Sequence, residues 1–314
     1  MAARIWILGS SDPEMELIEQ LLRECGETVV YATDSRGERV RGGTAYRGAH
    51  AEIPADAKRV YLVECDVPTP PGVERVVIDH HRPGDPGYGK GPGRFFEASS
   101  IGQVIRHLGQ VADDMPREYI LAAAADHCLA AAYRGECPGV DPDELMRWRA
   151  ESRARFQRRS VDDVLADIER ARQALRKALD ITLRRTPGGH CGDGSRCGCL
   201  EGGYGYGGWT GTGTGDCYCD CSGCEEGDYV VRARDMRGRH VPELPEAAAR
   251  EGVCFIADGL PDPDGRIKIV CQNGTPEQIE AFREWAEHRG LVDFYGDPAR
   301  GIAGAYEITA PAKA

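Results

Sequence analysis

Short apolar runs alternate with amphipathic stretches along the first part of the chain. Residues 4–8, 28–32, 59–63 and 73–78 are rich in β-branched residues and other strand formers, which is typical of buried strands. Between the first two runs, residues 14–23 place Leu and Ile side chains on one helical face, so they predict an amphipathic helix. This β-α-β order favours an α/β fold that begins with a parallel sheet.

Helical patterns follow the predicted sheet after a Gly/Pro-rich loop, residues 82–94, which we interpret as a mobile flap. Ser99 and Ser100 have the character of a helix N-cap, and a helix is expected to run from there through residues 101–105. A second, Ala-rich helix is expected over residues 117–133.

Later segments predict a connector and a second domain. The stretch 141–185 reads as helical, and residues 253–257 and 266–270 read as strands, followed by a helix over residues 277–288. The predicted architecture is therefore α/β, with a parallel-sheet domain, a helical connector and a smaller α+β domain. The expected boundaries are 1–140 for the first domain, 141–185 for the connector, 186–227 for a Cys/Gly-rich insert and 228–314 for the second domain.

Charge and hydropathy narrow the classes of partner. The chain has 314 residues and a net charge of −12, which argues against nonspecific binding to long nucleic acid. Small phosphorylated substrates remain compatible with this charge, because bound metal ions can supply local positive charge. The first apolar run is too short for a signal peptide, and no apolar stretch reaches membrane-spanning length. A cytoplasmic protein without membrane contact is therefore expected.

Cysteine is concentrated in the insert. Of the thirteen Cys residues, seven fall within residues 191–224, which in a cytoplasmic protein favours a Zn²⁺ site of one ion, or of two with His190 included, over disulfides. The candidate zinc ligands are His190, Cys191, Cys197, Cys199, Cys217, Cys219, Cys221 and Cys224. A disulfide-linked loop and a disordered thiol-rich linker remain alternatives, and the insert is also a candidate contact surface for a protein partner.

Acidic residues and histidines cluster at the ends of predicted strands and near one helix. The clusters occupy residues 12–16, 64–66, 79–81 and 126–127. The carboxyl ends of parallel strands form the usual ligand-binding edge of an α/β sheet. Asp, Glu and His side chains bind divalent metals, and two such ions together activate water and hold a phosphoryl group. We expect these clusters to converge into a two-metal site.

The order of these clusters resembles the DHH phosphoesterase superfamily over most of the chain. The family shows an acidic motif after the first strand, an acidic residue after a later strand, Asp-His-His, Ser-Ser before a helix and a further Asp. The corresponding segments here are Pro13-Glu14-Met15-Glu16, Leu62-Val63-Glu64-Cys65-Asp66, Asp79-His80-His81, Ser99-Ser100 and Asp126. The resemblance implies a dinuclear Mn²⁺ or Mg²⁺ centre that hydrolyses phosphoester or phosphoanhydride bonds.

The resemblance also implies roles for individual residues. His80 and Asp126 would be ligands of one metal, and Glu64 or Asp66 would bridge two metals. His81 would face the phosphate as a catalytic residue. Asp79, the other predicted catalytic residue, would orient the neighbouring histidines. The two serines of the Ser-Ser motif are the predicted substrate-binding residues of this domain.

The first motif departs from the family pattern. Ser10 occupies the usual His position, and Glu14 and Glu16 occupy the two Asp positions as further predicted metal ligands. A Glu carboxylate binds Mn²⁺ or Mg²⁺, but its extra methylene moves the oxygen by about one bond length. The alternative prediction is therefore a catalytically degenerate DHH-like protein that serves as a ligand-binding or zinc-stabilised interaction module.

Near the C-terminus, residues 296–304 resemble the Gly-Gly-His-Pro-type loop of the family's second domain, called DHHA1. Here Asp297 replaces the His, while Gly296, Arg300 and Gly304 could still hold a phosphate. The alternative is a Gly-rich turn before a last strand. The expected activity is hydrolysis of a nucleotide, a short single-stranded oligonucleotide, a cyclic dinucleotide or a polyphosphate, by a monomer or a homodimer.

Overall fold

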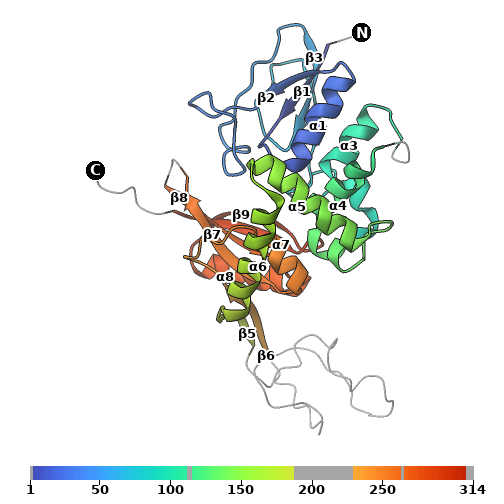
Figure 1. Ribbon diagram of the computed structural model, residues 1–314. Helices are drawn as coiled ribbons and strands as arrows, with labels where there is room; N and C mark the ends of the chain where they lie inside the picture. Colours follow the sequence, from blue (N-terminus) through green and yellow to red (C-terminus); the bar gives the residue numbers. More distant parts are fainter. Residues whose placement is uncertain (1–2, 112–114, 187–228, 263–264, 309–314) are drawn as a thin grey trace, which may run out of the picture.

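A computed structural model describes residues 3–111, 115–186, 229–262 and 265–308. The chain begins with a four-stranded parallel sheet in the order β2-β1-β3-β4 (Figure 1). Its strands are β1 (Ala3–Leu8), β2 (Thr28–Tyr31), β3 (Ala57–Val63) and β4 (Glu74–Ile78). Leu8 pairs with Val63, which pairs with Ile78, so these three strands end at one edge of the sheet. The predicted parallel sheet is confirmed.

Alternating side chains cover both faces of this sheet. Trp6 and Leu8 point to one face, where the Trp6 ring stacks on Tyr61 with ring centroids 4.0 Å apart. Ile5 and Ile7 point to the other face, against the chain that leads into β3. The helices packed on the first face include α1 (Pro13–Glu24), α3 (Ser100–His107), α4 (Arg117–Tyr133) and, at its edge, α5 (Pro142–Gln157). Two short turns, η1 (Pro92–Arg94) and α2 (Phe95–Ala98), precede α3.

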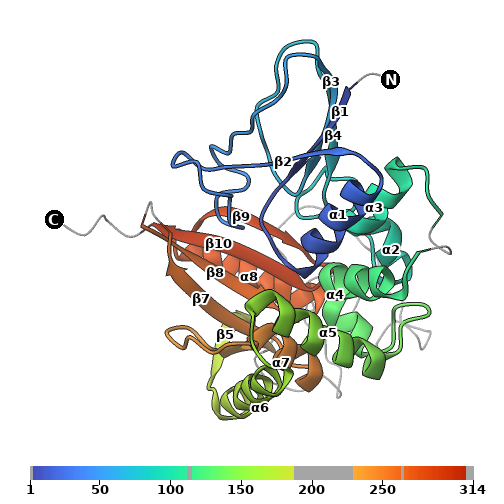
Figure 2. The same cartoon turned by 45° about the horizontal axis from the view of Figure 1, so that its top comes forward.

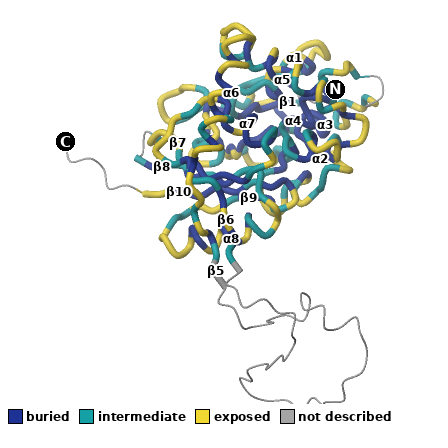
Figure 3. Tube along the Cα trace, turned by 60° about the horizontal axis from the view of Figure 1, so that its bottom comes forward, coloured by how far each residue is buried: buried dark blue, intermediate teal, exposed yellow. Residues whose placement is uncertain are grey.

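The second sheet has six strands in the order β5-β6-β7-β8-β10-β9, and its neighbours are antiparallel except for β6 and β7. Its strands are β5 (Asp180–Thr186), β6 (Tyr229–Asp235), β7 (Phe255–Pro261), β8 (Arg266–Gln272), β9 (Val292–Asp297) and β10 (Ile302–Ile308). Helix α8 (Pro276–His288) packs on one face, while α6 (Val161–Lys177) and α7 (Leu244–Glu251) cover part of the other. The dark-blue segments of Figure 3 show these buried interiors.

One expectation about the connector is wrong. Helices were predicted throughout residues 141–185, but the chain leaves α6 and forms β5. Leu179 would have continued the helical stripe, yet it is 78% exposed, whereas Leu183 is buried in the second sheet. Ile181 and Leu183 alternate with polar residues, which suits a strand that pairs with β6. The second sheet therefore starts before the predicted boundary at residue 228, and the Cys/Gly-rich residues connect two neighbouring strands.

We call residues 3–140 the N-terminal lobe and residues 180–308 the C-terminal lobe. Buried polar contacts from α4 and from the connecting helix α5 hold the C-terminal lobe in place. Glu246 of α7 accepts hydrogen bonds from Tyr133 of α4 and Arg149 of α5. Its carboxylate side chain is only 1% exposed. Glu243 binds Arg153 of α5 in the same way. Figure 2 shows α4 close to both α5 and α7.

None of the described helices combines the length and the apolar character that crossing a membrane requires. The predicted zinc ligands of the insert lie outside the residues that the structure describes.

Candidate metal centre

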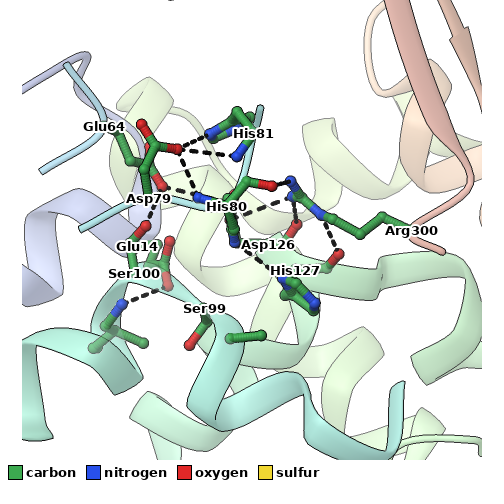
Figure 4. A network of polar contacts seen from close by, with 12 residues as sticks. Glu14, Glu64, Asp79, His80, His81, Ser99, Ser100, Asp126, His127 and Arg300 are labelled. Carbon is green, nitrogen blue, oxygen red and sulfur yellow. Dashed lines mark hydrogen bonds and ion pairs between the residues drawn. The ribbon is translucent and has the colours of Figure 1, made fainter. Parts of the chain in front are cut away.

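The predicted acidic clusters come together at the carboxyl edge of the first sheet (Figure 4). Glu64 follows β3, the Asp79-His80-His81 segment follows β4, Glu14 lies in the first turn of α1, and Asp126 projects from α4. Two overlapping groups could hold a metal ion, with donor atoms within 4.8 Å of one another. One group is Glu64, His80 and His81, and the other is Glu14, Glu64 and Asp126. Glu64 belongs to both groups, so it is the candidate ligand that they share.

Glu64 is held in an unusual backbone conformation. Its φ of 49° lies in the left-handed region, which costs a non-glycine residue about 1–2 kcal/mol. Its carboxylate accepts a hydrogen bond of 2.7 Å from the Ser100 hydroxyl. Burial, followed by repulsion from Asp126, raises the pKa of Glu64 well above its ordinary value. A cation beside this carboxylate would offset that repulsion.

Helix α1 delivers two carboxylates to the site. Asp12 caps the helix by accepting a bond of 2.8 Å from the Met15 amide, and removal from water, with Asp126 nearby, raises its pKa to about 6. Glu14 is buried and accepts a bond of 3.0 Å from the Ile101 amide at the start of α3. Asp12 was not among the predicted ligands, although its place two residues before Glu14, at the N-cap, was visible in the sequence.

Two predicted ligands are wrong. Glu16 is exposed, because residues two apart on a helix point to opposite sides and Glu14 is the one that faces the sheet edge. Asp66 also points away from the site; its carboxylate pairs with Arg75 at 2.8 Å, and its side chain is 50% exposed. Of the two carboxylates predicted in residues 64–66, only Glu64 therefore belongs to the cluster.

His80 and Asp126 face each other without a hydrogen bond. His80 is fully buried, and its Nε2 lies 3.0 Å from Asp126 Oδ2 and 3.5 Å from Glu64 Oε1. Within the described part of the chain, neither His80 Nε2 nor Asp126 Oδ2 has a hydrogen-bond partner. Burial, followed by the nearby Arg300, lowers the pKa of His80 well below its ordinary value. A neutral imidazole and a carboxylate left in this arrangement are suitable donors for a divalent metal.

Asp79 orients the histidines that follow it, as the resemblance implied. Its Oδ1 accepts bonds from the His80 amide at 2.7 Å, from the His81 amide at 3.1 Å and from His81 Nδ1 at 2.8 Å. Tyr46 donates to Oδ2 at 2.7 Å. Although burial opposes ionisation, the bond from His81 and its charge lower the pKa of Asp79 to about 2. Tyr46 lies in a loop without any motif, so its role is not visible in the sequence.

The two serines have structural partners in this state. Ser99 caps α3 by accepting from the Gly102 amide at 3.1 Å, and it donates to the carbonyl of Phe96 at 2.9 Å. Ser100, as described above, donates to Glu64. The structure therefore places Ser100 as support for a candidate ligand, and substrate binding by either serine stays a prediction.

Arg300 reaches from the C-terminal lobe into the metal centre. Its guanidinium donates to the carbonyls of His127 at 2.7 Å, Asp126 at 3.0 Å and His80 at 3.1 Å. Its side chain is only 2% exposed. These contacts give Arg300 a role in holding the backbone of the centre, and its role in holding phosphate stays a prediction.

The two glycines predicted to hold phosphate lie in strands. Gly296 lies in β9, the neighbour of β10, and its carbonyl accepts a hydrogen bond of 2.9 Å from Tyr88 in the flap. A Cβ on Gly304 would lie 2.2 Å from the hydroxyl of Tyr295, so the missing side chain makes room for that ring. Only residues 298–301 form the turn between β9 and β10. The alternative of a Gly-rich turn before a last strand describes this segment.

A cleft of about 660 Å³ separates the metal centre from the second sheet. Asp12, Glu64 and His81 line one side. Lys268 and Tyr295 line the other, with the Lys268 ammonium 5.0 Å from the centre of the Tyr295 ring. The cleft therefore sets a cation and an aromatic surface opposite the acidic cluster.

A scan against protein-family models finds no match, and a search of curated proteins finds no similar sequence.

Proposed function

We propose that this protein is a metal-dependent phosphohydrolase of the DHH phosphoesterase type, acting on a small phosphorylated substrate. The observation that carries the proposal is the pair of buried, unbonded atoms His80 Nε2 and Asp126 Oδ2, 3.0 Å apart among further carboxylates. Buried polar atoms are almost always hydrogen-bonded, so an unbonded pair of acceptors calls for a missing electrophile. The neighbouring Glu64 and His81 line the cleft, which makes the site accessible to a substrate.

The donor set fits Mn²⁺ or Mg²⁺. Carboxylate oxygens and one neutral imidazole suit such hard cations, and His80, Asp126, Glu64 and Glu14 would hold them. The lack of sulfur in both candidate groups makes a zinc–thiolate centre a poor fit at this place within the described residues. When bound, the metal would lower the pKa of a water molecule and neutralise charge on the phosphoryl group.

The chain's own residues would perform the remaining tasks. Asp79 fixes the His81 ring at the mouth of the site, where it can contact a phosphate oxygen. Lys268 presents a positive charge from the opposite side of the cleft, and Tyr295 presents a flat ring beside it. A volume of about 660 Å³ is of the size that a nucleotide or a short oligonucleotide requires.

Matched carboxamide variants test this proposal. Mn²⁺-dependent release of phosphate or nucleotide would be measured on a panel that contains a short oligonucleotide, a cyclic dinucleotide, a mononucleotide and a polyphosphate. Glu14→Gln and Asp126→Asn should each lower the rate by about 10²-fold or more, because both remove a candidate ligand. Glu16→Gln, on the same helix, and Asp66→Asn are controls that should stay within about 2-fold. Full activity of Glu14→Gln and Asp126→Asn together would contradict the site.

A non-catalytic binding protein is the second candidate function. It is favoured by the use of Glu64 and Glu14 as hydrogen-bond acceptors for Ser100 and for the Ile101 amide, which leaves each carboxylate less free for metal. In that case calorimetry would detect binding of one of the panel compounds in the cleft, and none of them would be hydrolysed in Mn²⁺ or Mg²⁺. Hydrolysis that disappears in Asp126→Asn would exclude this second function.

A further inference from the structure

Two histidine rings lie together behind the metal centre. Nδ1 of His80 lies 3.0 Å from Nδ1 of His127, and both residues are buried. Two ring nitrogens at this distance share one hydrogen, so one of them donates and the other accepts. The direction of this hydrogen bond decides whether Nε2 of His80 carries a hydrogen or a lone pair.

The flap settles the direction of this hydrogen bond. His127 Nε2 lies 2.8 Å from the carbonyl oxygen of Lys90, and a carbonyl can only accept, so Nε2 of His127 carries a hydrogen. A second hydrogen on Nδ1 would make a buried cation whose ring contacts only a carbonyl oxygen and a ring nitrogen of His80, so Nδ1 is left without hydrogen. A neutral ring with hydrogen on Nε2 has a lone pair on Nδ1. His80 is then the donor.

The other end of His80 agrees with this direction. If Nε2 of His80 carried the hydrogen, it would donate to Asp126 Oδ2 at 3.0 Å. In the described chain neither atom has a hydrogen-bond partner. With the hydrogen on Nδ1, Nε2 and Oδ2 are two acceptors, and a cation between them would remove their repulsion. An imidazole with a lone pair on Nε2 is also the form that binds metal.

We propose that His127 is a positioning residue that fixes the Nδ1–H tautomer of His80 and thereby presents the Nε2 lone pair to the metal centre. The hydrogen-bond chain runs from the Lys90 carbonyl to His127 and on to His80. The metal part of this inference rests on the proposed function, whereas the tautomer is a property of the metal-free protein. A histidine ligand usually donates its second nitrogen to a carboxylate or carbonyl, and here a second histidine takes that place.

The surrounding chain holds His127 in position for this task. Helix α4 has a non-helical conformation at Cys128, with φ −151° and ψ 55°, directly after His127. Arg300 donates to the carbonyl of His127 at 2.7 Å. Lys90 belongs to a flap that is tied to the C-terminal lobe, because the Gly89 amide donates to Asp297 at 2.8 Å. The His127 ring is therefore held in position by the flap carbonyl, the helix kink and the C-terminal lobe.

The first test reads the tautomer without metal or substrate. The protein is labelled with ¹⁵N-histidine, and the ring signals of His80 and His81 are assigned by their loss in His80→Gln and His81→Gln. The wild-type spectrum should show hydrogen on Nδ1 and a bare Nε2 for His80. His127→Leu, which removes the acceptor, should shift His80 toward Nε2–H. His81 should not change, because Asp79 holds its Nδ1.

His127→Asn is the conservative variant. Its Oδ1 replaces the Nδ1 acceptor, so the His80 tautomer should return toward the wild-type form, which a purely structural role would not produce. Mn²⁺ binding by calorimetry should weaken by about 10–100-fold in His127→Leu and less in His127→Asn. If His127→Leu does not fold, the wild-type and His127→Asn spectra still decide the question.

Two results would overturn the inference: an Nε2–H signal for His80 in the wild type, or an unchanged His80 tautomer in a folded His127→Leu. The proposed function fails separately. A wild-type protein with the expected tautomer that hydrolyses none of the panel compounds would leave the hydrogen-bond chain standing and exclude the enzyme.

Discussion

Replacing Arg300 by Met tests whether the C-terminal lobe stabilises the metal centre. The guanidinium is buried and donates to three carbonyl groups of the N-terminal lobe, those of His80, Asp126 and His127. Methionine keeps most of the apolar stem but cannot donate, so all three carbonyls lose their partner. The substitution therefore removes hydrogen bonds with little change in packing volume.

The magnitude follows from the nature of these bonds. A hydrogen bond to a charged group contributes about 1.5–3 kcal/mol, so three would give roughly 5–9 kcal/mol if nothing replaced them. The adjoining cavity of about 350 Å³ admits water that can bind some of the carbonyls. We therefore expect Arg300→Met to lower the free energy of unfolding by about 3–5 kcal/mol, similar to the loss of one partner of a buried ion pair.

Urea unfolding followed by circular dichroism would measure this loss. The matched control is Arg283→Met, since Arg283 pairs with Glu287 on the surface of α8 with 55% of its side chain exposed. It should change the free energy of unfolding by less than about 0.5 kcal/mol. A loss below about 1 kcal/mol for Arg300→Met would refute the structural role. Unchanged stability with a raised KM would instead restore the predicted role in substrate binding.

Three further outcomes are expected. Although burial opposes ionisation, Arg149 and then Tyr133 hold the pKa of Glu246 below its ordinary value. Glu246 therefore contributes to the free energy of unfolding above about pH 4.5, and this contribution is lost as the pH falls through the pKa of the folded state. Glu246→Gln should lower stability at pH 7 by about 3–5 kcal/mol and flatten the acid side of a stability–pH curve; an unchanged curve would contradict the pairing. Gly304→Ala should lower the free energy of unfolding in urea by about 1–3 kcal/mol, because the new methyl group presses on Tyr295. Adding Tyr295→Ala to the same chain should recover part of that loss. If the effects of the two substitutions simply add, the clash is excluded. In calorimetry, chelation of metal should lower Tm, and Mn²⁺ at about 100 times its Kd should restore about 2.7 kcal/mol of the free energy of unfolding. Equal Tm values with and without Mn²⁺ would argue against a metal site.

The first sheet and the place of the site could be predicted from the sequence because both depend on local patterns. Four apolar runs, each short and β-branched, define the strands, and parallel pairing brings their carboxyl ends to one edge. Glu64 and the Asp79-His80-His81 segment follow those ends directly, so their convergence needs no knowledge of distant contacts. Asp126 was found because an acidic side chain inside an Ala-rich helix requires a partner.

Helical geometry alone excludes Glu16, one of the two wrongly predicted ligands. Residues two apart on a helix are separated by about 200°, so Glu14 and Glu16 could not both face the sheet edge. The residues that pack on the sheet, among them Ile18 and Leu22, share a face with Glu14, and this selects Glu14 from the pattern alone. The choice between Glu64 and Asp66 had no such rule, because the chain leaves the strand at Glu64 with a positive φ.

The contacts that hold the centre together could not be read from the sequence, because they join segments far apart in the chain. Arg300 binds the carbonyl of His80 from 220 residues away, and Tyr46 binds Asp79 from 33 residues away. A hydrogen bond to a backbone carbonyl leaves no requirement on the side chain of the residue that accepts it. The sequence therefore shows Arg300 as a cation in a glycine-rich loop, which suggests phosphate binding. Only the packing of the two lobes shows that three of its five N–H donors bind backbone carbonyls.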